Sequence, residues 1–100
     1  MSEEIPIANP PLSDEEKSAV AKLTDADLQV IDAELLANSS PRWQKVALVV
    51  ILTENALRNR FPDLSYIFYS QRLIRLTEER RLNSQGNLEY MRFSEVRIPA

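Results

Sequence analysis

Apolar side chains recur at helical spacing along most of the chain, and the polar residues between them are typical of helix ends. Ser13, followed three residues later by Glu16, forms a capping box that predicts a short helix from residue 13 to about residue 23. Thr24, followed by acidic residues, predicts the start of a second helix. The apolar stripe of this second helix consists of Leu28, Ile31 and Leu35.

Two further helices are expected after residue 40. Ser40 can cap a helix, and Pro41 loses no hydrogen bond at a first helical position, so a third helix is predicted from Pro41 to about Asn59. Its core side comprises Trp43, Val46, Ala47, Val50 and Leu57. Phe61-Pro62-Asp63 breaks that helix, and Asp63 caps a fourth helix over residues 64–81. The expected buried arc of the fourth helix comprises Tyr66, Ile67, Tyr69, Leu73, Ile74 and Leu76, and the opposite arc comprises Ser65, Phe68, Gln71, Arg72, Arg75, Glu78 and Glu79.

Both ends of the chain lack helical periodicity. Gly86-Asn87 predicts a β-hairpin with strands at residues 82–85 and 88–93, because glycine can take the positive φ of a tight turn. Val96 and Ile98 alternate with charged residues, which predicts a little more strand. Prolines at 6, 10 and 11 exclude a helix or a central strand, so residues 1–12 are expected to form a flexible or extended arm. Residues 13–99 then form a single domain.

The order of these elements predicts the fold class. Three helices joined by tight turns and followed by a hairpin are typical of a winged helix-turn-helix domain. We therefore predict a mainly α fold with a small β-hairpin, winged helix-turn-helix-like, with an extra short amino-terminal helix. The third helix is longer than usual for this fold, and residues 38–40 leave little room for the short strand expected after the first helix. A plain helical bundle with a β appendage is the alternative.

Several segments between residues 43 and 97 form a distinctive set: Trp43, Lys45-Val46-Ala47, Phe61-Pro62-Asp63-Leu64-Ser65, Ile67-Phe68-Tyr69, Arg72-Leu73, Gly86, Met91-Arg92 and Ser94-Glu95-Val96-Arg97. Together they resemble a small bacterial domain family of unknown function with a winged-helix-like pattern. The resemblance covers roughly residues 25–99 and is most distinctive over residues 61–73 and at the carboxyl end. In other chains this domain often follows a second uncharacterised domain. The resemblance implies no catalytic residue, substrate or partner.

The amino-acid composition excludes most kinds of catalytic site. The chain has 100 residues with no cysteine, no histidine and a single glycine. Disulfides, thiolate or imidazole metal sites, cysteine or histidine catalysis and glycine-rich phosphate loops are therefore excluded. Carboxylates group at residues 14–16, at 25 and 27, and at 78–79, where helix starts and solvated surface explain them. We expect a non-enzymatic protein with no metal and no cofactor.

The same sequence predicts no association with membranes. Its longest apolar run, Val46 to Leu52, is far shorter than the roughly 20 residues that span a bilayer. The acidic amino terminus differs from the basic start of a secretory signal, so a cytoplasmic location is expected. Charge is unevenly distributed: residues 1–37 carry nine carboxylates and two lysines, a net charge of −7, whereas residues 38–100 carry ten basic and six acidic groups, a net charge of +4.

Double-stranded DNA is one candidate ligand. If the fourth helix takes the recognition position, Gln71, Arg72 and Arg75 point outward, where arginine binds guanine edges or phosphates and glutamine reads adenine. Arg92 and Arg97 are placed to reach phosphates from the hairpin. The pI near 4.9 opposes this interpretation. Arg75 also lies one helical turn before Glu79, a spacing at which the two side chains can pair.

A protein partner or a second copy of the chain is the other candidate. The third helix has a second apolar patch away from its core side, and the fourth helix is expected to expose an apolar anchor. The predicted partner-binding residues are Leu48, Val49, Leu52, Ala56, Leu64 and Phe68. A homodimer through the helix over residues 41–59 would use the first of these patches. Alternatively, the acidic amino-terminal helix, or Ile5 and Ile7 of the arm, covers one of the patches within the chain.

The sequence therefore predicts a non-catalytic binding module. The first interpretation of this module is a winged-helix DNA-binding or regulatory domain, because the order of the helices and strands favours that fold. The alternative is a protein interaction or self-association module that binds no nucleic acid.

Overall fold

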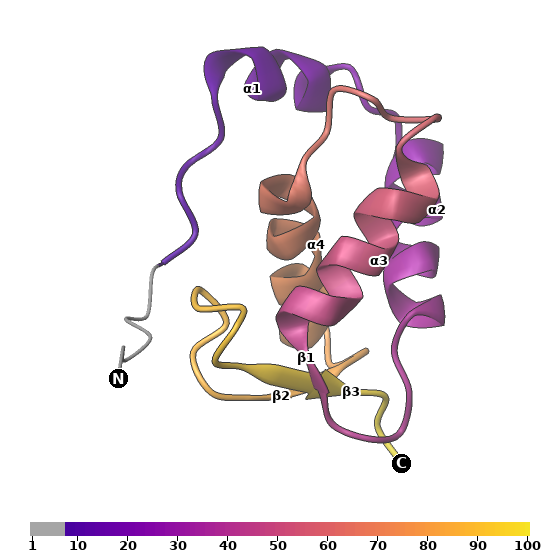
Figure 1. Ribbon diagram of the computed structural model, residues 1–100. Helices are drawn as coiled ribbons and strands as arrows, with labels where there is room; N and C mark the ends of the chain where they lie inside the picture. The colour runs from indigo at the N-terminus through magenta and orange to yellow at the C-terminus, as the bar shows by residue number, and fades with distance from the viewer. Residues whose placement is uncertain (1–7) are drawn as a thin grey trace.

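Residues 8–100 are described by the computed structural model, and they form helices packed against a small sheet (Figure 1). The elements, in chain order, are α1 (Asp14–Ala21), α2 (Asp25–Ala37), β1 (Gln44–Lys45), α3 (Val46–Leu57), α4 (Tyr66–Glu78), β2 (Asn83–Gln85) and β3 (Glu95–Arg97). Helices α2, α3 and α4 pack against one another, the sheet lies at one end of this group, and α1 lies at the other end. Residues 1–7 of the predicted arm lie outside the described residues.

The sheet topology completes the winged-helix-like arrangement. The strand order is β1-β3-β2, and both pairs are antiparallel. Val96 in the central strand lies opposite Gln44 on one side and Ser84 on the other. The strand after α2 is therefore present, at residues 44–45 and not at 38–40. The predicted fold class, mainly helical with a small β part and an extra amino-terminal helix, is confirmed.

Side chains from three helices and the sheet form the core. The predicted stripe of α2 is confirmed, since Ile31 and Leu35 are buried and Leu28 is half-buried. Removing such large apolar side chains from water is the main contribution to folding. The buried apolar residues are Ile31, Leu35, Val46, Val49, Val50, Leu57, Leu64, Phe68, Tyr69, Leu73, Leu76, Leu82 and Val96.

The first two helices begin where the sequence predicts. The Ser13 hydroxyl accepts a hydrogen bond from the Glu16 amide (3.2 Å), and Thr24 and Asp27 exchange both bonds of a capping box. The Thr24 amide lowers the pKa of the Asp27 carboxyl below its ordinary value. The Glu16 side chain does not accept a hydrogen bond from the Ser13 amide but binds Ser65 instead. Only half of the capping box predicted at Ser13 and Glu16 therefore forms.

The third helix begins later than predicted, at Val46 and not at Pro41. The residues before Val46 are extended because they pair with β3. No side chain caps α3; carbonyl groups between β2 and β3 accept hydrogen bonds from its first amides. These bonds join the Val46 amide to the Ser94 carbonyl (3.0 Å) and the Ala47 amide to the Met91 carbonyl (2.9 Å).

The fourth helix is shorter than the predicted span of residues 64–81. Its N-cap is Ser65 and not Asp63, because the chain makes another turn in which Leu64 becomes buried. At the other end Arg80 takes a φ of 61°, in the left-handed region. The Arg80 amide donates to the Thr77 carbonyl and the Arg81 amide donates to the Leu76 carbonyl, which is the bonding pattern of a Schellman helix end.

The predicted β-hairpin, with a two-residue turn at Gly86-Asn87, is wrong for its second strand. Gly86 does take a positive φ, of 83°, but residues 88–93 form a loop, and β2 pairs with β3. We call residues 86–94 the wing loop. Turns bonded to Asn87 and Tyr90 fold this loop back on itself. A Cβ atom on Gly86 would lie 2.7 Å from the Phe93 carbonyl oxygen, so the loop requires glycine there.

The end of α4 gives a direct test of backbone strain. A residue with a Cβ atom is disfavoured in the left-handed region, whereas glycine is not. We expect Arg80→Gly to raise the free energy of unfolding by about 1 kcal/mol. Arg80→Ala, which removes the same side chain but keeps Cβ, is the matched control and should give no such gain. Urea denaturation checks this, and equal effects of the two substitutions would contradict the strain argument.

Candidate interaction surfaces

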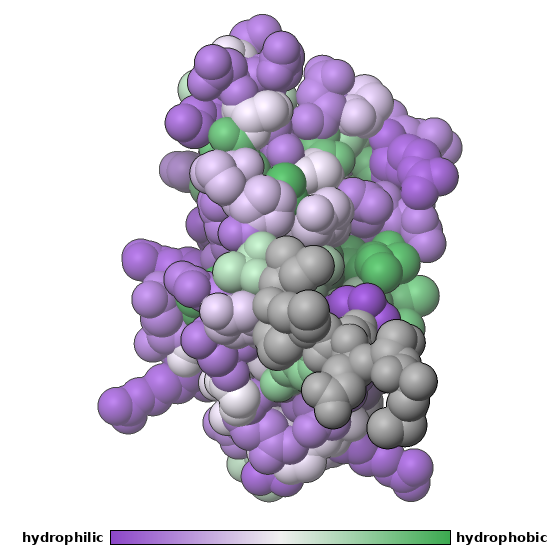
Figure 2. Space-filling model, turned by 60° about the vertical axis from the view of Figure 1, so that its left-hand side comes forward, coloured by the Kyte–Doolittle hydropathy of each residue, from purple (hydrophilic) through white to green (hydrophobic). Residues whose placement is uncertain are grey.

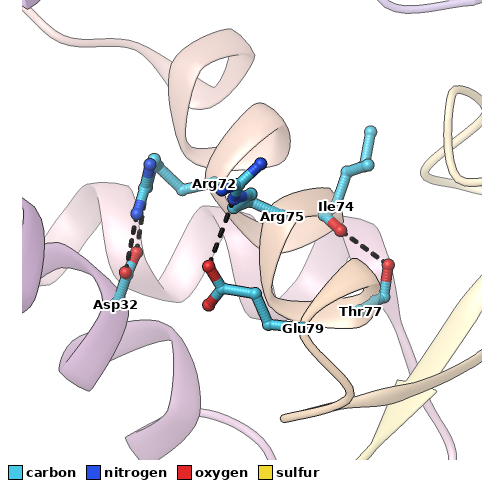
Figure 3. Close-up of polar contacts among 6 residues, drawn as sticks. All are labelled: Asp32, Arg72, Ile74, Arg75, Thr77 and Glu79. Carbon is cyan, nitrogen blue, oxygen red and sulfur yellow. Dashed lines mark hydrogen bonds and ion pairs between the residues drawn. The ribbon is translucent and has the colours of Figure 1, made fainter.

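Arg72 of α4 is bound to α2 and does not point outward. Its Nε donates to Asp32 Oδ1 (3.0 Å) and its Nη2 donates to Asp32 Oδ2 (2.8 Å), so the pair is bidentate (Figure 3). Both side chains are largely buried, with exposed fractions of 21% and 10%. Hydrogen bonding to Asp32 raises the pKa of the Arg72 guanidinium. The prediction that Arg72 points outward is therefore wrong, because the tightly packed α2 supplies it with a partner.

Gln71 and Arg75 are exposed on α4, as predicted. Arg75 Nε donates to Glu79 Oε2 (3.1 Å) across one helical turn, which confirms the geometry expected for that pair (Figure 3). The two side chains are 61% and 40% exposed, so the pair contributes little to stability. The cluster of outward arginines predicted for this helix is reduced to Arg75, and a carboxylate accompanies it.

The predicted apolar anchor of α4 is buried. Phe68 is 5% exposed and Leu64 is 8% exposed, so neither presents a surface to a partner, and this prediction is wrong. Phe68 lies one turn before Arg72 and so faces α2 with it. Leu64 lines one cavity together with Ala19 of α1 and Leu23, which follows that helix. The alternative that the amino-terminal helix covers a patch within the chain holds for Leu64, whereas Ile5 and Ile7 lie outside the described residues.

The remaining predicted DNA contacts lie away from α4, in the wing. Arg92 is in the wing loop and Arg97 is in β3. The Arg97 guanidinium carbon lies 4.4 Å from the centre of the Trp43 ring, so its cation interacts with an aromatic face. Trp43 precedes β1 and is not on the core side of a helix, which corrects that prediction. The cation–π contact therefore joins Arg97 of β3 to Trp43, which lies just before β1.

The amino-terminal segment crosses the outer face of α4. Two oxygens of Glu16 bind Ser65: the Ser65 amide donates to Oε2 (2.7 Å) and the Ser65 hydroxyl donates to Oε1 (2.8 Å). Glu16 is 6% exposed, so this carboxylate is a buried cap for the start of α4. Earlier in the chain, the Asn9 side chain reaches the middle of α4, where its Nδ2 donates to Ser70 Oγ (2.8 Å). The Asn9 backbone amide donates to the Glu89 carbonyl of the wing loop (2.9 Å). No sequence pattern predicts these long-range contacts.

The largest exposed apolar side chains on the helices lie on α3. Leu48 and Ile51 are 47% exposed and Leu52 is 40% exposed, and Figure 2 shows apolar surface gathered at the level of this helix. We call Leu48, Ile51 and Leu52 the α3 stripe. Of the predicted patch, Leu48, Leu52 and Ala56 are exposed, whereas Val49 is buried. Partner binding at the exposed residues stays a prediction. Ile51 was in neither the predicted core side nor the predicted patch, and it is exposed beside Leu48 and Leu52.

Tyr69 of α4 is fully buried, and its hydroxyl has no hydrogen-bond partner among the described residues. Burial raises its pKa to about 12, and the carboxylates of Glu54 and Glu16 add to the rise. The predicted role of Tyr69 in the core is confirmed, although its polar tip is not bonded.

No group of three acidic side chains within residues 8–100 is arranged to hold a metal ion. No helix in the described part of the chain has the length and apolar character needed to cross a bilayer.

Comparisons of the chain with protein-family models, curated proteins and solved structures gave no match. The resemblance to a bacterial family of unknown function stays a prediction.

The two arginines of α4 allow a matched test of burial. We expect Arg72→Ala to lower the free energy of unfolding by about 3 kcal/mol, because Asp32 stays buried without its partner. Arg75→Ala removes an exposed pair and should cost less than about 0.5 kcal/mol. Urea denaturation of both variants measures the difference, and similar losses would contradict the assigned burial of the Arg72–Asp32 pair.

Tyr69 gives a test at alkaline pH. Below pH 10 its phenol is protonated in the folded and unfolded chain, so its contribution to stability is constant. Between pH 10 and about 12 the unfolded chain releases this proton first, so the free energy of unfolding should fall. Tyr69→Phe should show a smaller fall over this range, and no loss of stability at pH 7. Urea denaturation at pH 8 and pH 11 tests this, and equal falls for both proteins would refute it.

Proposed function

We propose that this chain is a non-catalytic self-association module, in which a second copy binds the α3 stripe. The observation that carries the proposal is that three large aliphatic side chains, Leu48, Ile51 and Leu52, are each at least 40% exposed on adjacent turns of one helix. Exposed aliphatic surface of this kind is costly in water and is typical of an interaction site. Nothing within residues 8–100 covers it.

The chemistry of the stripe suits a second copy. The run from Val46 to Thr53 contains no charged residue, so two such faces can meet without like-charge repulsion. A twofold axis brings the same patch of both copies together, which requires a self-complementary surface, and an uncharged aliphatic stripe meets that requirement. Phe93, 41% exposed, lies in the wing loop segment whose backbone is bonded to the start of α3.

Double-stranded DNA is supported less well. The element order favours it, but a DNA-binding face gains its affinity from unpaired cations that contact phosphates. On α4, Arg72 is held by Asp32 and Arg75 is accompanied by Glu79. The outer face of that helix is crossed by the amino-terminal segment and carries no other basic side chain.

Sedimentation of the full chain at increasing concentration tests the proposal. We expect the mass to rise from 11.5 kDa toward twice that value. Leu48→Glu and Ile51→Glu should each weaken association at least about 30-fold, because they place a carboxylate in an apolar contact. Gln29→Glu, at an exposed position on α2, adds the same charge away from the stripe and is the matched control.

Two results would contradict self-association through α3. One is a monomer at every concentration up to the millimolar range. The other is a dimer that Leu48→Glu, Ile51→Glu and Gln29→Glu leave equally intact. Circular dichroism of each variant confirms that the helices persist, so a loss of mass can be attributed to the interface.

A further inference from the structure

A groove runs between α4 and the wing loop, and the chain's own amino-terminal segment lies along it. Figure 1 shows the indigo segment before α1 running beside α4 toward the wing loop. Asn9 joins the two walls, since its side chain binds Ser70 of α4 and its amide binds the Glu89 carbonyl. The lining residues are Asn9, Pro10, Pro11, Ile67, Ser70, Gln71, Ile74 and Glu89.

The segment occupies this groove only in part. Pro10 and Pro11 are exposed, and a cavity of about 340 Å³ is left between them and α4. Within residues 8–12, Asn9 makes two hydrogen bonds to the rest of the protein, and Leu12 is half-buried against the core. Residues 9–11 are thus held to the groove mainly by Asn9, and a segment with so few hydrogen bonds opens at low free-energy cost.

The groove has the chemistry of a peptide site. Ile67 and Ile74 supply apolar walls, and Ser70 and Gln71 supply polar groups between them. Prolines hold a chain extended, so little conformational entropy is lost when such a segment binds. Among residues 8–100, no basic side chain lines the groove, and Glu89 is acidic, so these residues offer no cation to a nucleic-acid phosphate.

We propose that this groove binds an extended Asn-Pro-Pro-type segment of a partner protein, and that Asn9, Pro10 and Pro11 occupy the site as an internal competitor. The Asn side chain of the partner donates to Ser70 Oγ, and its backbone amide donates to the Glu89 carbonyl, as those of Asn9 do. The tethered segment competes at a high effective concentration, so the partner binds when it displaces that segment. This site is separate from the α3 stripe and does not depend on self-association.

A peptide with the sequence of residues 1–12 serves as the probe, added to the full chain. Asn9→Ala in the protein removes the internal bond to Ser70 and leaves the folded elements unchanged. We expect the peptide to bind this variant about fivefold more tightly than the unsubstituted protein, the factor expected for one hydrogen bond. Amide signals of Ile67, Ser70, Gln71 and Glu89 should shift in nuclear magnetic resonance spectra during the titration.

Two controls locate the site. Asn9→Ala in the peptide should weaken binding by a similar factor, and Ser70→Ala in the protein should make the two peptides equivalent. The proposal is overturned if the peptide fails to bind the Asn9→Ala protein at millimolar concentration, or if it binds both proteins equally. It is also overturned if mixed duplex DNA, and not the peptide, shifts the α4 signals at low salt.

Discussion

The bidentate ion pair between Arg72 and Asp32 joins α4 to α2. Because both groups are nearly buried, neither can be removed without leaving the other without a partner in a poorly hydrated site. The pair holds the Arg72 side chain of α4 against α2. Phe68, one turn before Arg72, is buried, whereas Ser70 and Gln71 line the groove beside the wing loop.

Part of the uneven charge along the chain is paired within the molecule. The acidic first part of the chain supplies Asp32 to Arg72, Asp27 to Arg60 and Glu16 to the start of α4. On α4, Arg72 is therefore paired with a carboxylate of the first part, and Arg75 is paired with Glu79 of the same helix. The face that remains unpartnered is apolar, and it lies on α3.

Local patterns predicted much of the fold. The caps at Ser13 and Thr24, the stripe of α2 and the positive φ of Gly86 depend on neighbouring residues and were correct. The errors arise where distant segments decide the outcome. Pairing with β3 extends the residues before Val46, and Glu16, far away in the sequence, makes Ser65 the helix start.

The candidate sites were less predictable for the same reason. A helical wheel divides a helix into two sides, but α3 and α4 each contact more than one neighbour, so Val49 and Phe68 are buried although they lie off the main stripe.

Hydroxyl-radical footprinting of the unsubstituted protein at low and high concentration measures the exposure of side chains on both helices in one experiment. We predict that oxidation of Leu48, Ile51 and Leu52 decreases as concentration rises, whereas that of Phe68 is low throughout. Unchanged oxidation of the α3 stripe, or strong oxidation of Phe68, would contradict the account.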